Sequence, residues 1–352
     1  MPDAGAATPE IGIPWEMQRG VWLSLVSRRQ QTYDRETGRR RIVENRRVKV
    51  ARVVAVALAG AVLALAVSVR LNPSSLILLA HDVRIRSPFC SVWKATLDGR
   101  IKLRQQSIAR ELAERSHVVR SDAGLVLWAT PAGDFWIPGD DRETLPILLA
   151  QEERNIYGKG EWGVHRGDVV LDAGAYIGTW TRQALANGAR LVVAIEPSPA
   201  SIECLRRNLR AEIEAGKVVV YPKGIWDREG ALTFFANSAS GVGNGFVEEN
   251  GNTRKIDAIP VTTIDNLAAE LKLARVDFIK ADVKGATERL LRGGASVIRR
   301  DRPRLAISTE ETADDALAIA GLARKIQPAY EMKCGPCLTD SKDIYTDVLF
   351  FR

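Results

Sequence analysis

The second half of the chain alternates short apolar runs with segments of helical residue spacing. The runs are rich in Val, Leu and Ile, which is typical of parallel strands buried on both faces. Strands that alternate with helices predict a parallel sheet. The predicted strands cover residues 169–173, 191–195, 217–221, 276–282 and 304–308, and residues 330–333 and 347–351 form a late pair. The pattern predicts an α/β fold with a mostly parallel sheet and helices on both faces.

Three further elements are predicted before this sheet. Residues 101–119 place apolar side chains among charges at helical spacing, which predicts an amphipathic helix. The apolar residues 125–128 and 135–137 flank the turn-forming residues 131–134, which predicts a β-hairpin. Residues 144–157 predict a helix that leads into the sheet.

A different pattern occupies residues 53–69, which carry no charged side chain. A helix of this length spans roughly 25 Å at about 1.5 Å per residue, near the lower limit for crossing a bilayer. Arg52 and Arg70 stand at its two ends, where their long side chains can reach the membrane surfaces. We predict a membrane-anchor helix, with a fully buried core helix as the alternative.

The charge distribution supports attachment to a membrane. The formal net charge is +7, and basic residues crowd the segment before residue 53. They are Arg28, Arg29, Arg35, Arg39, Arg40, Arg41, Arg46, Arg47, Lys49 and Arg52. A basic arm before an apolar run faces anionic lipid more often than nucleic acid, so a membrane partner is predicted and a nucleic-acid partner is not.

The side of the membrane is a conflict within the sequence. The basic cluster keeps the N-terminus in the cytoplasm, and one crossing would then put the sheet outside. A turn back near Pro73, or an anchor that does not cross, keeps the sheet on the cytoplasmic face, which we predict. The remaining alternative is a sheet that lies outside and does not methylate. The predicted organisation is a basic arm over 1–52, an anchor helix over 53–69, a juxtamembrane linker over 70–144 and the main domain over 145–352.

The first strand of the sheet ends in a motif that points to a ligand. Asp172, Gly174 and Gly178 form the pattern Asp-x-Gly-x-x-x-Gly. Gly174 can adopt a positive φ and lets a ligand approach the backbone, while Gly178 lets the next helix pack near the strand. A carboxylate at the strand end repels a pyrophosphate, so the motif disfavours a dinucleotide. It favours a cationic ligand such as S-adenosylmethionine (SAM), with its sulfonium and ammonium groups.

Further residues extend the predicted cofactor site. The second strand ends in Glu196, which commonly accepts hydrogen bonds from ribose hydroxyls at this place. Glu152, Glu153 and Tyr157 either cover the methionine end of the cofactor or face solvent. An indole at position 226 either contacts adenine or packs in the protein. The predicted cofactor-binding residues are Asp172, Gly174, Tyr176, Gly178, Glu196, Pro197 and Trp226.

These motifs resemble a known family. Asp172-x-Gly174-x-x-x-Gly178, Glu196-Pro197, Asn208, residues 261–265 and Phe278-Ile279-Lys280-x-Asp282-x-x-Gly285 resemble the FkbM-type methyltransferases. The resemblance covers roughly residues 145–310. It implies a class I methyltransferase fold, which is Rossmann-like, and methyl transfer from SAM to a hydroxyl of a sugar or secondary metabolite. The predicted membrane anchor adds a lipid-linked acceptor as an expectation.

The chain departs from the family at one turn. Lys284 and Thr287 stand where an acidic pair normally flanks the glycine. This departure keeps a second function open, namely a catalytically inactive methyltransferase fold that binds partners in a membrane protein assembly.

Candidate catalytic residues lie at the ends of the later strands. Asp282 is the first candidate for a general base towards an acceptor hydroxyl, Glu310 is the second, and Lys280 is the third catalytic candidate. Asp282 could instead form a structural ion pair with Lys280 or Lys284. No metal site is predicted, because His81, His117 and His165 lack the spacing of metal ligands.

Two of the four cysteines form a Cys-x-x-Cys motif, at positions 334 and 337. The residues after it favour a loop over a helix, so a disulfide or buried thiols are favoured over redox catalysis. Cys90 and Cys204 are predicted to be isolated.

Overall fold

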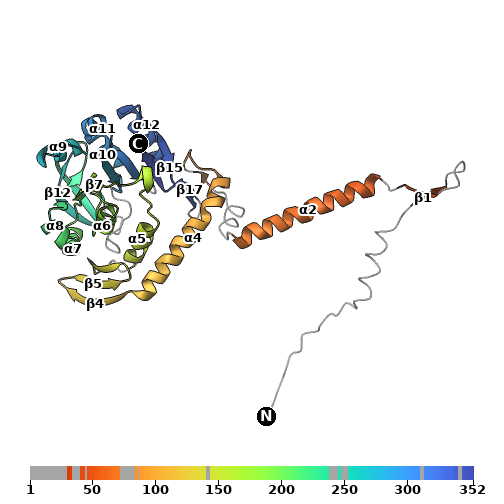
Figure 1. Ribbon diagram of the computed structural model, residues 1–352, viewed down its shortest axis with the longest axis horizontal. Coiled ribbons are helices and arrows are strands. Elements are labelled where there is room, and N and C mark those ends of the chain that lie inside the picture. The colour runs from red at the N-terminus through yellow and green to blue at the C-terminus, as the bar shows by residue number, and fades with distance from the viewer. Residues whose placement is uncertain are drawn as a thin grey trace, which may run out of the picture. The chain divides into compact units, whose positions relative to one another are not determined.

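The structure, a computed structural model, describes residues 30–33, 40–43, 46–71, 84–85, 87–139, 143–237, 245–246, 253–309, 313–339 and 343–352. The chain divides into two units, residues 1–71 and residues 72–352, and each is described by itself (Figure 1). The start of the predicted basic arm and the predicted turn near Pro73 lie outside the described residues. The predicted boundary between linker and main domain at residue 145 stays a prediction.

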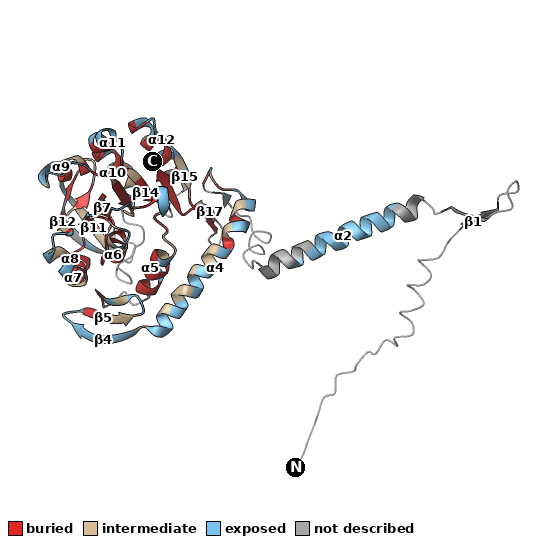
Figure 2. Ribbon diagram, in the orientation of Figure 1, coloured by how far each residue is buried: buried red, intermediate tan, exposed pale blue. Residues whose placement is uncertain are grey.

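The first unit contains one long helix. The strands β1 (Gln30–Tyr33) and β2 (Arg40–Val43) pair antiparallel, and α2 covers Arg46–Leu71. Helix α2 contains the apolar run and also four of the basic residues before it, namely Arg46, Arg47, Lys49 and Arg52. Within this unit, its side chains from residue 50 to residue 63 are exposed (Figure 2).

The structure does not support the membrane anchor predicted for residues 53–69. Across the described ranges, no helix has both the length and the apolar character that crossing a membrane requires.

A seven-stranded sheet forms the centre of the second unit, in the order β15-β18-β14-β13-β7-β8-β9. Its strands are β7 (Val169–Ala173), β8 (Leu191–Ile195), β9 (Val218–Tyr221), β13 (Phe278–Ala281), β14 (Arg304–Ser308), β15 (Met332–Cys334) and β18 (Val348–Phe351). All neighbours from β14 to β9 pair parallel, whereas β18 is antiparallel to both β14 and β15. The mostly parallel sheet and its late closing pair are confirmed.

Helices cover both faces of this sheet (Figure 1). Helices α6 (Thr179–Ala186), α7 (Pro199–Asn208) and α8 (Arg210–Glu214) lie on one face, and α9 (Ile264–Glu270), α10 (Thr287–Gly293), α11 (Ala295–Asp301) and α12 (Ala313–Ile326) lie on the other. Strand residues alternate between them: Leu171 packs with α9–α12, and Val170 packs with α6. Both core faces are apolar, as the uninterrupted runs predicted.

The predicted β-hairpin is confirmed and gains a third strand. The sheet β4-β5-β6 consists of His117–Asp122, Leu125–Thr130 and Gly133–Pro138, and Thr130 pairs with Gly133 across the turn. The helix predicted for residues 101–119 is α4 (Val92–Arg115), so both its start and its end were predicted wrongly. Residues 117–119 belong to β4, because the β-branched Val118 and Val119 lie in a segment that pairs with β5.

The remaining elements of the second unit are short. Helix α5 covers Thr144–Glu153, and η1 covers Gly160–Trp162. Strands β10 (Gly224–Ile225), β11 (Gly230–Asn237) and β12 (Thr253–Thr262) form one small sheet, and β3 (Arg84–Ile85), β16 (Cys337–Thr339) and β17 (Asp343–Thr346) form another. Helix α10 ends at Gly293, where a Cβ would lie 2.2 Å from the Trp226 carbonyl oxygen.

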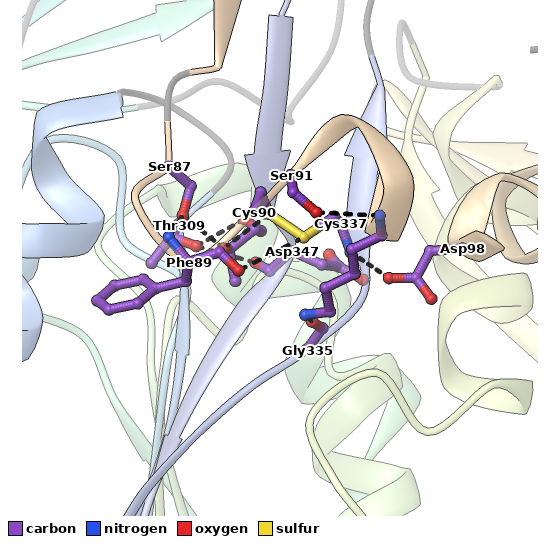
Figure 3. The surroundings of a disulfide bond; sticks show 11 residues. Ser87, Phe89, Cys90, Ser91, Asp98, Thr309, Gly335, Cys337 and Asp347 are labelled. Atoms are coloured by element: carbon purple, nitrogen blue, oxygen red, sulfur yellow. Dashed lines mark hydrogen bonds between the residues drawn. A yellow bond between two sulfur atoms is a disulfide. The ribbon is translucent and has the colours of Figure 1, made fainter. Parts of the chain in front are cut away.

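A disulfide joins Cys90, just before α4, to Cys337 in β16 (Figure 3). The prediction that Cys90 is isolated is therefore wrong, and Cys337 does not pair with Cys334, which is a free, half-buried thiol. The two bonded cysteines are 247 residues apart in sequence, so no local pattern could reveal the pairing. Asp98 accepts a hydrogen bond from the Cys337 amide at 2.8 Å, which adds to the attachment of α4 to the C-terminal strands.

Candidate active site

A cavity of about 340 Å³ opens at the carboxyl ends of the parallel strands. Open α/β sheets bind their ligands at this edge, and the volume lies within the range of small-molecule pockets. Its wall is built by α5, the turn after β7, the end of β8, the small sheet around β10, and the turn after β13. The wall contains Glu152, Tyr157, Gly174, Tyr176, Glu196, Pro197, Lys280, Asp282 and Lys284.

The turn after β7 has a backbone that requires glycine. Gly174 has a φ of 80°, and a Cβ there would lie 2.0 Å from the carbonyl oxygen of Asp282. Gly178 has a φ of 88° and meets the Leu209 side chain, so it packs against the protein beside the cavity. Gly174 therefore serves the cavity wall, and Gly178 serves the packing predicted for it.

Glu196 is buried in the wall beside this turn. One of its oxygens accepts a hydrogen bond from the Tyr176 amide at 2.9 Å, and the other accepts from the Ser198 amide at 2.9 Å. Burial raises the pKa of Glu196 to about 7, although these two bonds favour the charged form. Glu196 therefore lies where the sequence placed it, with each oxygen able to accept a further hydrogen bond.

Asp172 does not line the cavity. It is fully buried, with one oxygen accepting a 2.6 Å hydrogen bond from the Thr181 hydroxyl and the other 3.1 Å from the Lys280 ammonium. Asp172 and Lys280 are direct neighbours in the register of β7 and β13, on the same face of the sheet. The negative charge that suggested a cationic ligand is thus compensated by Lys280 within the protein.

Lys280 also holds the glycine turn. Its ammonium donates a 2.7 Å hydrogen bond to the Gly174 carbonyl oxygen. Burial alone would lower the pKa of Lys280, but the carboxylates of Asp172 and Asp282 hold it above its usual value. Lys280 therefore stays protonated and cannot accept a proton at neutral pH.

Asp282 lies at the other side of the cavity, at the end of β13. One of its oxygens accepts a 2.7 Å hydrogen bond from the Tyr157 hydroxyl, and both side chains line the wall. The structure thus brings Asp282, Lys280 and Tyr157 together. Glu310, the second general-base candidate, lies outside the described residues.

Trp226 stands outside the cavity. Its ring packs edge-on against Phe246 with centroids 5.8 Å apart, and the Arg289 guanidinium lies 5.6 Å from the ring centroid. These contacts agree with the alternative in which the Trp226 indole packs within the protein instead of contacting adenine.

Glu152 is the site residue that sequence reasoning left undecided. Only 8% of it is exposed, and it lines the cavity from α5, whereas its neighbour Glu153 is exposed. Burial raises the pKa of Glu152 to about 8, with Lys280 opposing and nearby carboxylates adding to the shift. Glu152 follows Leu145 and Leu149 at helical spacing, and this shared buried face is the sequence signal that marks it.

The donor set fits SAM by its chemistry. A glycine turn in the cavity wall, a buried carboxylate where the sequence predicts the ribose and a buried carboxyl with one unpartnered oxygen suit a ligand with hydroxyl and cationic groups. In the part of the chain that the structure describes, no three His, Cys, Asp or Glu residues are grouped to hold a metal ion.

Solved structures similar to this chain have low sequence identity. They include a methyltransferase FkbM from Methylobacillus flagellatus KT, with 18% identity, a TM-score of 0.41, and coverage of 73% of this chain and 60% of that one. A SAM-dependent methyltransferase from Agrobacterium tumefaciens has 13% identity, a TM-score of 0.36, and coverage of 66% and 71%. A protein from Streptococcus mutans, determined in complex with SAH, has 11% identity, a TM-score of 0.34, and coverage of 58% and 96%. Since these TM-scores are low, the fold rests on the sheet topology described above.

No curated protein matches the sequence. The family model described as the methyltransferase FkbM domain matches residues 172–322. This segment runs from the end of β7 into α12. It therefore includes the glycine turn, β8 with Glu196 after it, and β13 with Lys280 and Asp282 at its end. The match confirms, for residues 172–322, the resemblance to the FkbM methyltransferase domain that the motifs predicted.

Proposed function

We propose that this protein transfers a methyl group from SAM to a hydroxyl of its acceptor. The observation that carries the proposal is the positive-φ turn at Gly174 in the cavity wall with buried Glu196 beside it, at the ligand edge of a mostly parallel sheet. The FkbM domain match over residues 172–322 supports the methyl transfer, while the hydroxyl acceptor is our proposal.

The residues of the cavity have different roles in this reaction. Glu196 would accept hydrogen bonds from the ribose hydroxyls, and the turn at Gly174 would let the cofactor approach the backbone. When bound, SAM supplies a methyl group that is already activated as a sulfonium. Lys280 keeps the turn in place by holding Asp172 and the Gly174 carbonyl, so it is a positioning residue. Alignment of the two reactants then supplies much of the rate.

Asp282 is the proposed general base. It reaches the cavity beside Tyr157, whose hydroxyl donates to one of its oxygens. A carboxylate within hydrogen-bond reach of an acceptor hydroxyl can take its proton during methyl transfer. Tyr157 fixes the orientation of the carboxylate for this step.

The acceptor is proposed to be amphiphilic, either lipid-linked or a sugar or secondary metabolite presented at a membrane surface. Support comes from the exposed Val53, Val56 and Leu63 of α2, which follow basic residues. Basic residues are attracted to an anionic membrane surface, where exposed apolar side chains next to them can leave water. Flotation of the full chain with vesicles tests this: binding to phosphatidylserine vesicles is expected, and failure to float with them contradicts membrane attachment.

A second function is a binding subunit without catalysis. Its support is Lys284, which lines the cavity at a position where the family normally carries an acid. The two functions differ in turnover: the enzyme converts SAM to SAH with an acceptor, whereas the binding subunit never does.

The cofactor site is tested by Glu196→Ala. Loss of the carboxylate leaves ribose hydroxyls unpaired and is expected to weaken SAM binding by about 1–3 kcal/mol. Calorimetry on the full chain measures the affinity, and Glu203→Ala, an exposed acid on α7 that pairs with Arg207, is the matched control. An affinity unchanged by Glu196→Ala would remove this residue from the site.

A further inference from the structure

Glu152 has a buried carboxyl oxygen that lacks a hydrogen-bond partner. The Thr179 hydroxyl donates to Oε1 at 3.3 Å, while no donor among the described residues reaches Oε2, which is itself buried. The side chain lies in the cavity wall with 8% of its surface exposed. A buried carboxylate is costly unless it is paired, so the empty cavity favours the neutral acid.

The charges that act most strongly on Glu152 add to this preference, although Glu196, Lys223 and Lys284 also line the cavity. Asp172 comes from β7, Lys280 from β13 and Asp282 from the turn after it, while α6 offers the uncharged Thr179. Lys280 is already occupied by Asp172 and the Gly174 carbonyl. These groups carry one net negative charge, and ionised Glu152 would add a second one beside them. A bound cation would reverse this balance.

We propose, on the basis of the function above, that Glu152 responds to the charge of the cofactor: it is neutral in the empty cavity and gives its proton to solvent when SAM binds. The ammonium and sulfonium groups of SAM belong to its methionine end and are both positive. A positive charge near a carboxyl favours its ionised form. The O–H bond of Glu152 breaks, the proton goes to the buffer, and no group is oxidised or reduced.

The same balance distinguishes SAM from SAH. Methyl transfer removes the sulfonium charge and leaves the ammonium, so the cavity holds one positive charge fewer after the reaction. Glu152 is then protonated again in a fraction of the molecules. Binding of SAH therefore releases fewer protons, on average, than binding of SAM. This difference weakens the hold of the cavity on the product.

Calorimetry of the full chain with SAM at pH 7, in phosphate and in Tris buffer, counts the protons released on binding. The wild type is expected to release close to one proton, and its affinity is expected to rise about tenfold from pH 6 to pH 7. The conservative Glu152→Gln is expected to bind SAM with little proton release and a flat pH dependence. Glu153→Gln, an exposed neighbour, is the matched control and is expected to behave as the wild type.

Several results would overturn the inference. Binding of SAM without proton release overturns it and leaves the proposed function intact, whereas complete absence of binding overturns both. Proton release that persists in Glu152→Gln but disappears in Glu196→Gln assigns the proton to Glu196 instead. Should Glu152→Gln not fold, a wild-type affinity that is flat between pH 6 and pH 7 overturns the inference.

Discussion

Replacing Lys280 with methionine removes the centre of the buried polar cluster under the glycine turn. Methionine keeps the length and the apolar stem of lysine but removes the ammonium. Asp172 then loses its only described cationic partner, which lies 3.1 Å away, and the Gly174 carbonyl loses its 2.7 Å donor. The Thr181 hydroxyl still donates to Asp172.

The expected loss in the free energy of unfolding follows from the burial of the Lys280–Asp172 ion pair. The side chains of Lys280 and Asp172 are 4% and 0% exposed, so water cannot replace the lost ammonium. Removing one partner of a buried ion pair costs about 3–5 kcal/mol, because the other charge stays buried and unpaired. Asp172→Asn in the same chain removes that charge while keeping an acceptor for Thr181. The double variant is therefore expected to recover about 2 kcal/mol or more of the loss.

Urea unfolding of the wild type, both single variants and the double variant measures this coupling as a double-mutant cycle. The exposed Lys325→Met on α12 is the control and is expected to change the free energy of unfolding by less than about 0.5 kcal/mol. Additive costs of Lys280→Met and Asp172→Asn, or a cost of Lys280→Met no larger than that of the control, would refute the ion-pair reasoning.

Three further predictions follow from the same structure. Gly174→Ala is expected to abolish SAM binding in calorimetry, because its Cβ would lie 2.0 Å from the Asp282 carbonyl at a φ of 80°; affinity within twofold of wild type contradicts this. Cys90→Ser opens a loop closed across 247 residues and is expected to cost about 2–5 kcal/mol. A reductant should therefore lower the urea midpoint of the wild type but not of the variant, and equal effects on both would argue against the disulfide. Glu152 has a folded-state pKa of about 8 against an ordinary 4.5, so its contribution to stability is complete below pH 4.5 and is lost as the pH rises through 8. The wild type should thus lose about 1.4 kcal/mol per pH unit relative to Glu152→Gln in that window, and parallel stability curves would show that Glu152 does not titrate there.

The sequence predicted the features that depend on local pattern. Buried parallel strands need apolar side chains on both faces, so runs such as residues 169–173 and 304–308 are recognisable without any partner. The hairpin around residues 131–134 is likewise set by its turn residues. Glu196 could be placed because a strand end fixes the side of the sheet on which a residue lies.

The features that were missed depend on contacts between distant segments. Lys280 meets Asp172 through strand register, and the two are far apart in sequence. The partner of Cys90 is 247 residues away, and the nearby Cys334 offered a misleading local motif. The boundary between α4 and β4 was missed because helical spacing continues while the pairing with β5 decides the strand. A helix face, rather than a motif, places Glu152 in the cavity.

The proposed function requires that the cavity at the end of β7 binds SAM. Equilibrium dialysis of the full chain against labelled SAM tests it directly, with unlabelled SAH and NAD as competitors and a cooperative thermal transition as proof of folding. We expect one SAM bound per chain, displaced by SAH and not by NAD. No SAM retained by the folded protein at millimolar concentration, or displacement of SAM by NAD, would contradict it.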